Sequence, residues 1–152
     1  MKEQLQSDLT AAMRAKDELT VSTLRMALTA LTNEEVAGKE ARQLSDADVV
    51  AVLSREVKKR REAATAYDDA GRVELAERER LEEQVLTRYL PEPLSEAELA
   101  TLIDEAVAAA ESAGLTGGKA MGAVMKQVQP VTLGRADGAA VAVAVKKRLG
   151  LG

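Results

Sequence analysis

Two prolines separated by a single residue, Pro91 and Pro93, constrain the fold of this 152-residue chain more than any other feature. Proline has no backbone N–H and disfavours helical geometry at the residue before it, so a helix cannot continue through this stretch. Apolar residues follow helical spacing on both sides of the break. The sequence therefore predicts two helical parts, residues 1–90 and residues 91–152, joined by a proline hinge.

The N-terminal part contains four apolar stripes at helical spacing, each typical of a helix that buries one face. These stripes are Leu5, Leu9, Ala12 and Met13; Val21, Leu24, Leu28 and Leu31; Val49, Val52, Leu53, Val57, Ala64 and Tyr67; and Leu75, Leu81, Val85, Leu86 and Tyr89. Helices with short connections pack as a small antiparallel bundle or as paired hairpins. We therefore expect an N-terminal four-helix module.

Capping and turn residues indicate where these helices begin and end. Gly38 is expected to close the second helix in the left-handed conformation, which glycine adopts without strain. Ser45 and Asp48 have the spacing of an N-cap followed by an acidic residue in the first turn of the third helix. Gly71 lies in the expected turn of a helical hairpin, and the return helix is predicted over residues 73–90.

The densest basic cluster, residues 55–62, lies on the expected third helix. Neighbouring residues on a helix point about 100° apart, so the consecutive cations at positions 58–61 cannot form one flat patch. We favour a solvated helix face for this cluster, with a nucleic-acid footprint as the alternative.

Three helices are expected in the C-terminal part. Ser95 and Glu98 have the spacing of a capping box at the start of the first helix, which stops at Gly114. Residues 129–138 are expected to form a loop, in which Asp137 caps the last helix. The apolar stripes are Leu99, Leu102, Ile103 and Ala106; Met121, Val124, Met125 and Val128; and Val141, Val145 and Leu149. The predicted fold class is thus all-α, with an N-terminal four-helix module joined by a proline hinge to a C-terminal three-helix bundle.

The chain contains no histidine and no cysteine, which excludes several kinds of chemistry. It therefore lacks the commonest general base, the thiolate nucleophile, and the main imidazole and thiolate metal ligands. Phe and Trp are also absent, which leaves few bulky side chains to line an apolar pocket. We predict no catalytic residue, no metal site and no cofactor, and leave enzymatic activity uncertain.

No apolar run approaches the roughly 20 residues that a membrane span needs, and no apolar segment follows a basic N-terminus. The lack of cysteine fits a reducing compartment. The sequence therefore predicts a soluble, cytoplasmic protein with no membrane partner.

Charge is distributed unevenly along the C-terminal part. The net charge of −4 argues against a general nucleic-acid coat, because nonspecific affinity depends on neutralising phosphates. Residues 92–111 carry six acidic residues and no cation, whereas residues 112–152 carry six cations and one acid, a local charge of +5. From this basic end we select as candidate phosphate contacts Lys119, Lys126, Arg135, Lys146 and Lys147.

Two glycine-containing connections lie among these cations. Residues 117–119 are Gly-Gly-Lys but do not form a phosphate loop, because that motif needs glycine and serine or threonine where this chain has Ala113 and Ala120. The glycines either let the backbone approach a phosphate or only shape a turn. Arg135 has no obvious local partner and can bind a phosphate through two parallel hydrogen bonds.

A series of short motifs runs in order over nearly the whole chain. They are Leu24-Arg25-Met26, Asn33-Glu34-Glu35, Arg55-Glu56-Val57-Lys58-Lys59-Arg60, Ala70-Gly71-Arg72, Tyr89-Leu90-Pro91, Leu94-Ser95, Met121-Gly122, Val124-Met125 and Gly134-Arg135-Ala136-Asp137-Gly138. Together they resemble the GatB/YqeY family in its free-standing, YqeY-like form. The resemblance implies an all-α protein in two parts. The C-terminal part is similar to the C-terminal domain of the B subunit of the tRNA-dependent amidotransferase, which in that enzyme contacts tRNA and performs no chemistry.

Three functions follow from the charge pattern and the resemblance. The leading hypothesis is a noncatalytic tRNA-associated binding module that uses the five candidate cations. The first alternative is a helical adaptor that docks on an aminoacyl-tRNA synthetase or an amidotransferase subunit. The second is a carbon–nitrogen ligase with glutamine as amido-N-donor, as the resemblance implies, although no nucleophile and base are recognisable as a pair.

Overall fold

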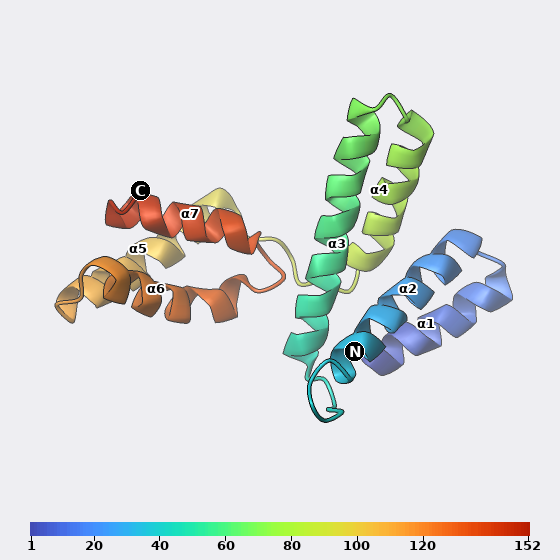
Figure 1. The fold of residues 1–152 in the computed structure, drawn as a ribbon, viewed down its shortest axis with the longest axis horizontal. Coiled ribbons are helices and arrows are strands. Elements are labelled where there is room, and N and C mark those ends of the chain that lie inside the picture. Colours follow the sequence, from blue (N-terminus) through green and yellow to red (C-terminus); the bar gives the residue numbers. More distant parts are fainter. The chain divides into compact units, whose positions relative to one another are not determined.

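The computed structural model of the protein describes residues 1–152, and its regular elements are all α-helices (Figure 1). The predicted all-α fold class is confirmed. The helices belong to two compact units, an N-terminal unit, Met1–Leu90, and a C-terminal unit, Pro91–Gly152. None of the helices is both long enough and apolar enough to cross a bilayer.

The N-terminal unit contains four helices arranged as two hairpins (Figure 1). They are α1 (Lys2–Ala15), α2 (Glu18–Glu35), α3 (Asp46–Asp69) and α4 (Val73–Thr87). The turn between α3 and α4 contains Gly71 at a φ of 73°, as the sequence predicts. All four helices contribute to one apolar core, whose fully buried leucines are Leu5, Leu24, Leu31, Leu53 and Leu86.

α2 ends earlier than the sequence indicates, and Gly38 does not close it. The helix ends at Glu35 with Val36 as the C-cap, and the φ of Gly38 is not positive. The N–H of Val36 donates to the carbonyl of Thr32, and the N–H of Arg42 donates to the carbonyl of Glu35. Because the chain beyond the helix supplies these donors, the last carbonyls are satisfied without a glycine cap.

The buried face of α4 differs from the predicted apolar stripe. Leu75 and Leu81 were expected to be buried and are 40% and 48% exposed, whereas Ala76 and Glu82 are buried. The helix also ends at Thr87, before the predicted end at residue 90. Val85 and Leu86 of the predicted stripe are buried, but nearer the start of α4 an ion pair with α3 takes the place expected for Leu81.

Arg60 on α3 and Glu82 on α4 form this ion pair. Both residues are 6% exposed, and Nε of Arg60 lies 3.4 Å from Oε2 of Glu82. Nη1 of Arg60 also donates 3.0 Å hydrogen bonds to the carbonyl and the carboxylate of Glu56. The interpretation of residues 55–62 as a solvated face is therefore wrong for Arg60, whose charge is buried between two carboxylates although its Nε makes no hydrogen bond.

Two more carboxyl groups near the Arg60–Glu82 pair have shifted pKa values. Burial raises the pKa of Glu56, but hydrogen bonds from Lys59 and Arg60 outweigh burial and hold that pKa below its usual value. The pKa of Glu79 is raised, first by burial and second by the charge of Glu82. Glu56 therefore stays ionised beside Arg60, where its charge is needed.

A tyrosine beyond α4 connects the end of the N-terminal unit to α1. The hydroxyl of Tyr89 donates to Oδ2 of Asp8, 81 residues earlier in the chain. Burial of the phenol, its hydrogen bond to Asp8 and the charge of Asp8 raise the pKa of Tyr89 well above its ordinary value.

The C-terminal unit contains three helices, α5 (Glu96–Ser112), α6 (Gly117–Thr132) and α7 (Gly138–Leu149). All three helices contribute to a second core, made of small and branched side chains. Its buried residues are Ile103, Ala106, Val107, Ala110, Ala120, Val124, Val128, Val141 and Val145.

Capping residues lie at three helix starts where the sequence predicts them. Ser45 and Asp48 form a full capping box at α3, and Ser95 and Glu98 form one at α5. The side chain of Asp137 accepts a hydrogen bond from a first-turn amide of α7. These predictions are confirmed because each depends only on residues three positions apart.

Residues 129–138 are not entirely a loop, because α6 continues through Pro130 to Thr132. Thr132 is buried and extends the inner stripe of the helix. The amide of Leu133 donates to the carbonyl of Gln129, which satisfies the helix end. Packing and this hydrogen bond therefore outweigh the one backbone donor that proline lacks.

We expect Glu82→Gln to destabilise the N-terminal unit by about 3 kcal/mol, because Arg60 then loses its partner on α4 while it remains buried. The double change Arg60→Met with Glu82→Leu should restore much of this loss, because the buried pair is then replaced by apolar groups. Urea unfolding followed by tyrosine fluorescence measures this unit, since Tyr67 and Tyr89 are the only aromatic residues and both lie in it.

The control for this experiment is Arg61→Ala, which breaks a surface ion pair between a largely exposed arginine and Glu83. It should lower the free energy of unfolding by less than about 1 kcal/mol. A Glu82→Gln effect no larger than the Arg61→Ala effect contradicts the importance of the buried pair.

The tyrosine contact predicts a shifted titration. In a Tyr67→Phe background, the tyrosinate absorbance of folded protein should reach its midpoint above the ordinary tyrosine pKa of about 10. Asp8→Asn should move the midpoint down, because the hydrogen bond is weakened and the carboxylate charge is removed. The raised folded pKa means that the stability from this contact is present below a pH of about 10 and is lost as the pH rises further. Equal midpoints in folded and urea-unfolded protein rule out this contact.

Candidate nucleic-acid interface

Two of the predicted phosphate contacts, Lys119 and Lys126, lie on the outer side of α6. This helix buries a stripe of residues at spacings of four, which runs from Ala120 to Thr132. Lys119 and Lys126 are exposed and seven residues apart. They therefore lie on one side of the helix, opposite the stripe, roughly 10 Å apart along the axis.

The start of α6 adds to the positive potential beside Lys119. Gly117 has a φ of 56° and so shapes the turn before the helix, which agrees with one of the two interpretations of the glycines. The N-cap residue, Thr116, makes no side-chain hydrogen bond to the first turn. The first amides of α6 therefore have no capping oxygen, and the positive end of the helix dipole lies next to Lys119.

Two further predicted contacts, Lys146 and Lys147, lie in the last turn of α7. Cations are favourable there because the carbonyl end of a helix carries partial negative charge. Both lysines are exposed, and neither forms an ion pair. Arg148 differs, because its Nε donates a 2.6 Å hydrogen bond to Asp104 on α5.

The sequence shows no obvious local partner for Arg135, and the structure gives it a partner far away in the chain. Its Nε donates a 2.8 Å hydrogen bond to the backbone carbonyl of Glu92. The carbonyl of Arg135 in turn accepts a 2.9 Å hydrogen bond from the N–H of Leu94. Arg135 therefore holds the first residues of the unit against the connection between α6 and α7, and only its Nη groups remain available for a phosphate.

The structure spreads the five candidate residues along the C-terminal unit. α6 and α7 run antiparallel (Figure 1), so Lys119 lies at the same end of the unit as Lys146 and Lys147. Arg135 lies at the other end, because the 12 residues of α7 extend for about 18 Å. Lys126 lies between the two ends on α6. A continuous surface that includes all five residues stays a prediction.

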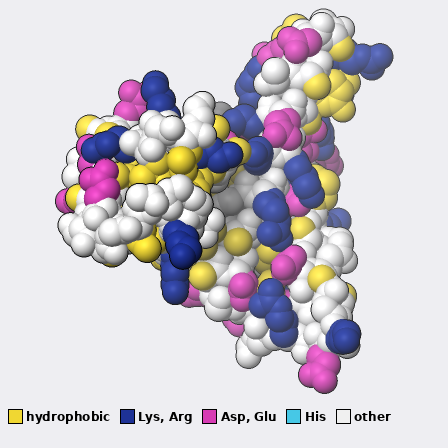
Figure 2. All heavy atoms as spheres, turned by 60° about the vertical axis from the view of Figure 1, so that its left-hand side comes forward, with side chains coloured by type: hydrophobic (Ala, Val, Ile, Leu, Met, Phe, Trp, Pro, Cys, Tyr) yellow, Lys and Arg dark blue, Asp and Glu magenta, His cyan; other side chains and the backbone are white.

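Cations of the N-terminal unit contrast with these lysines, because acidic neighbours neutralise many of them. Figure 2 shows Lys and Arg side chains interspersed with Asp and Glu along this unit. The basic cluster at residues 55–62 and its surroundings form ion pairs between Arg55 and Glu34, Lys59 and Glu56, Arg60 and Glu82, and Arg61 and Glu83. These pairs leave less charge available for a nucleic acid.

A family of known proteins matches this chain over almost its entire length. The family model described as "Yqey-like protein" matches residues 2–149. The chain belongs to the YqeY-like family. The resemblance predicted from the sequence motifs is thereby confirmed.

Two fungal relatives of this YqeY-like chain extend the comparison. The chain is 33% identical to an uncharacterised protein of Schizosaccharomyces pombe over 92 residues, which cover 60% of this chain and 72% of that protein. It is 27% identical over 128 residues to a Pyrenophora tritici-repentis protein named "Altered inheritance of mitochondria protein 41, mitochondrial". This match covers 82% of the chain and 69% of that protein. Neither name states a molecular activity.

Sequence reasoning missed the structural contact of Arg135 for a physical reason. The partner is a backbone carbonyl 43 residues earlier, and a carbonyl leaves no side-chain signature in a sequence. The two glycines around Arg135 indicate a turn but do not indicate what the turn contacts.

We expect Arg135→Ala to loosen the start of the C-terminal unit. Loss of a charge-assisted hydrogen bond costs about 1.5 kcal/mol, which corresponds to roughly tenfold in an opening equilibrium. Hydrogen exchange at the amide of Leu94 should therefore accelerate by about tenfold. The amide of Leu151, which donates to Lys146 at the far end of α7, is the internal control and should be unaffected. Equal exchange of Leu94 in both proteins contradicts the proposed contact.

Proposed function

We propose that this YqeY-like protein is a tRNA-associated binding module that works without catalysis. Exposed cations of α6, of α7 and of the connection between them contact phosphates of the RNA. The proposed contacts are Lys119, Lys126, Arg135, Lys146 and Lys147.

The observation that carries this proposal is the difference in pairing between the two units. Many cations of the N-terminal unit, including those of the basic cluster, are drawn into ion pairs within the fold, as with Arg55, Arg60 and Arg61. The four lysines of the C-terminal unit are exposed and unpaired, so their charge is available to an external anion. Lysine is a suitable phosphate ligand because its ammonium group acts as a mobile point charge.

The distribution of acidic residues gives the C-terminal unit an electrostatic direction. Six of its seven acids lie before α5 or on it, and only Asp137 lies further along the chain. A polyanion is repelled by the α5 side and attracted to the outer surfaces of α6 and α7. The arrangement therefore supports binding with one preferred orientation, although the net charge of the whole chain is −4.

The proposal is tested by tRNA affinity measured across a salt series. Each lost phosphate contact lowers the slope of log affinity against log salt by about one unit, because fewer counterions are released. Lys126→Ala with Lys147→Ala should therefore lower the slope by about two units and weaken binding to every tRNA similarly. An unstructured RNA of equal length, bound less tightly than tRNA, shows that the shape of tRNA is recognised.

A variant of the N-terminal unit provides the comparison for this measurement. Lys58→Glu with Lys59→Glu should weaken binding less, because Lys59 is already paired with Glu56 and the two side chains point to different sides of α3. The assignment is overturned if the C-terminal variant binds tRNA like the wild type while the N-terminal variant loses binding. The binding site would then lie on α3.

The cytoplasmic location expected from the sequence also remains a proposal. The name of the Pyrenophora relative places that protein in the mitochondrion. Because the sequence predicts a cytoplasmic protein, cytosolic tRNA is the first ligand to test. The mitochondrial relative makes mitochondrial tRNA the second.

A further inference from the structure

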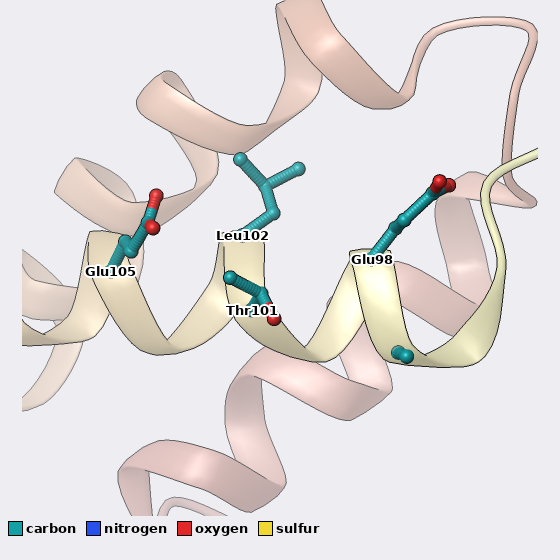
Figure 3. Close-up of a pocket in the computed structure, with 5 residues that line it drawn as sticks. Glu98, Thr101, Leu102 and Glu105 are labelled. Atoms are coloured by element: carbon teal, nitrogen blue, oxygen red, sulfur yellow. The ribbon is translucent and has the colours of Figure 1, made fainter.

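A shallow groove lies along one side of α5, next to the face that packs on the core. It is lined by Ala97, Glu98, Thr101, Leu102 and Glu105 (Figure 3). Figure 3 shows the side chains of Glu98, Leu102 and Glu105 pointing to the same side of the helix. Leu102 is partly buried and packs against the C-terminal core, and its remaining surface provides the apolar centre of the groove. The two glutamates lie one turn before and one turn after it. The groove is thus apolar at its centre and acidic at both ends.

The outer side of α7 carries the opposite combination. Val143 is 65% exposed, the highest value for any large apolar side chain in the chain. Ala139 and Ala140, one turn before it, are exposed and small enough to permit close approach of another helix. Lys146 and Lys147 follow one turn after Val143 on the same side. We call Ala139, Ala140, Val143, Lys146 and Lys147 the lysine patch.

The groove and the lysine patch match in spacing as well as in charge. A carboxylate lies three or four residues from Leu102 on each side, and the lysines lie three and four residues from Val143. When Val143 lies on Leu102, the lysines therefore face Glu105 if the helices are parallel and Glu98 if they are antiparallel. Neither Glu105 nor the two lysines form an ion pair within the chain, so both charges remain available.

We propose that the occupant of the α5 groove is the lysine patch of a second copy of this chain. The inference is independent of the proposed function and concerns a different partner. Each copy carries both surfaces, so one groove–patch contact joins two copies, and a two-fold axis forms this contact twice where both surfaces face the same partner. The contact is small and polar at its ends, so the dimer belongs to the weak class that buries less than about 1,200 Å². Added salt should weaken it, because exposed charges are screened within about 8 Å at physiological ionic strength.

Self-association has a consequence for nucleic-acid binding. Lys146 and Lys147 belong both to the lysine patch and to the proposed phosphate contacts. One lysine side chain cannot contact a carboxylate and a phosphate fully at the same time. A polyanion that binds these lysines therefore competes with the second copy and shifts the protein toward the monomer.

Charge reversal provides the test, with sedimentation equilibrium of the full chain at low salt as the measurement. The first variant is Glu98→Gln with Glu105→Lys, in which glutamine preserves the capping box at the start of α5. The second variant is Lys146→Glu with Lys147→Glu. The wild-type protein should show an average mass that rises with concentration, and each variant alone should lose this rise. An equimolar mixture of the two variants should regain it, because the unchanged lysines of the first variant then face the unchanged glutamates of the second in either helix orientation.

Two control variants change charge at positions outside the groove and the lysine patch. Glu111→Lys on α5 and Lys39→Glu in the N-terminal unit change charge outside both surfaces and should associate like the wild type. Helix content by circular dichroism shows whether each variant is folded, and recovery in the mixture is itself evidence of folding. A wild type that stays monomeric at all concentrations overturns the inference, as does a mixture that stays monomeric.

Two further outcomes would show that another molecule, and not a second copy of the chain, binds the α5 groove or the lysine patch. A monomeric wild type that retains a lysine-rich amphipathic peptide, and loses it in the Glu98→Gln with Glu105→Lys variant, assigns the groove to a different cationic chain. A monomeric wild type in which the lysine reversal affects only tRNA affinity assigns the lysines to RNA alone. The proposed function survives this last outcome and fails only if tRNA affinity is unchanged, so the two failures are distinguishable.

Discussion

The structure depends on close packing of helices whose cores contain no aromatic ring. The buried apolar residues in both units are Leu, Ile, Val and Ala. Such side chains fill space well but resemble one another in shape, so apolar contact alone specifies the register of two helices weakly. Polar contacts supply what the cores lack. The buried Arg60–Glu82 pair joins α3 to α4, and an exposed pair of Arg148 with Asp104 adds a weaker link between α7 and α5.

Because polar contacts are needed to fix helix register, some charged side chains make contacts within the fold and others remain available on the surface. In the N-terminal unit, Arg60 of the basic cluster is buried between α3 and α4, where its guanidinium contacts both Glu56 and Glu82. In the C-terminal unit, Arg135 and Arg148 make structural contacts, while the lysines at the helix ends are unpaired. Arginine therefore mainly serves the fold in this protein, and lysine provides the charge that is available to a partner.

The C-terminal unit combines opposite surfaces in one small bundle. The acids are concentrated on α5 and the available cations on α6 and α7, so the unit has an acidic side with an apolar groove and a basic side with an exposed valine. We propose that a polyanion and a second copy of the chain both bind the basic side. Their competition would give one binding surface two states without any change in the fold.

The sequence by itself determined the all-α class, the starts of three helices and the family. The Ser45–Asp48 and Ser95–Glu98 capping boxes and the Asp137 cap were predictable because each joins residues three positions apart, so the pattern is local. The tertiary structure decided which charges are buried or engaged. Arg60 pairs with a residue 22 positions away, and Arg135 bonds to a carbonyl 43 positions away, so neither contact leaves a local pattern. Packing also decided that Leu75 and Leu81 face water and that α6 continues through Pro130, because burial of a helix face outweighs the preference of a single residue.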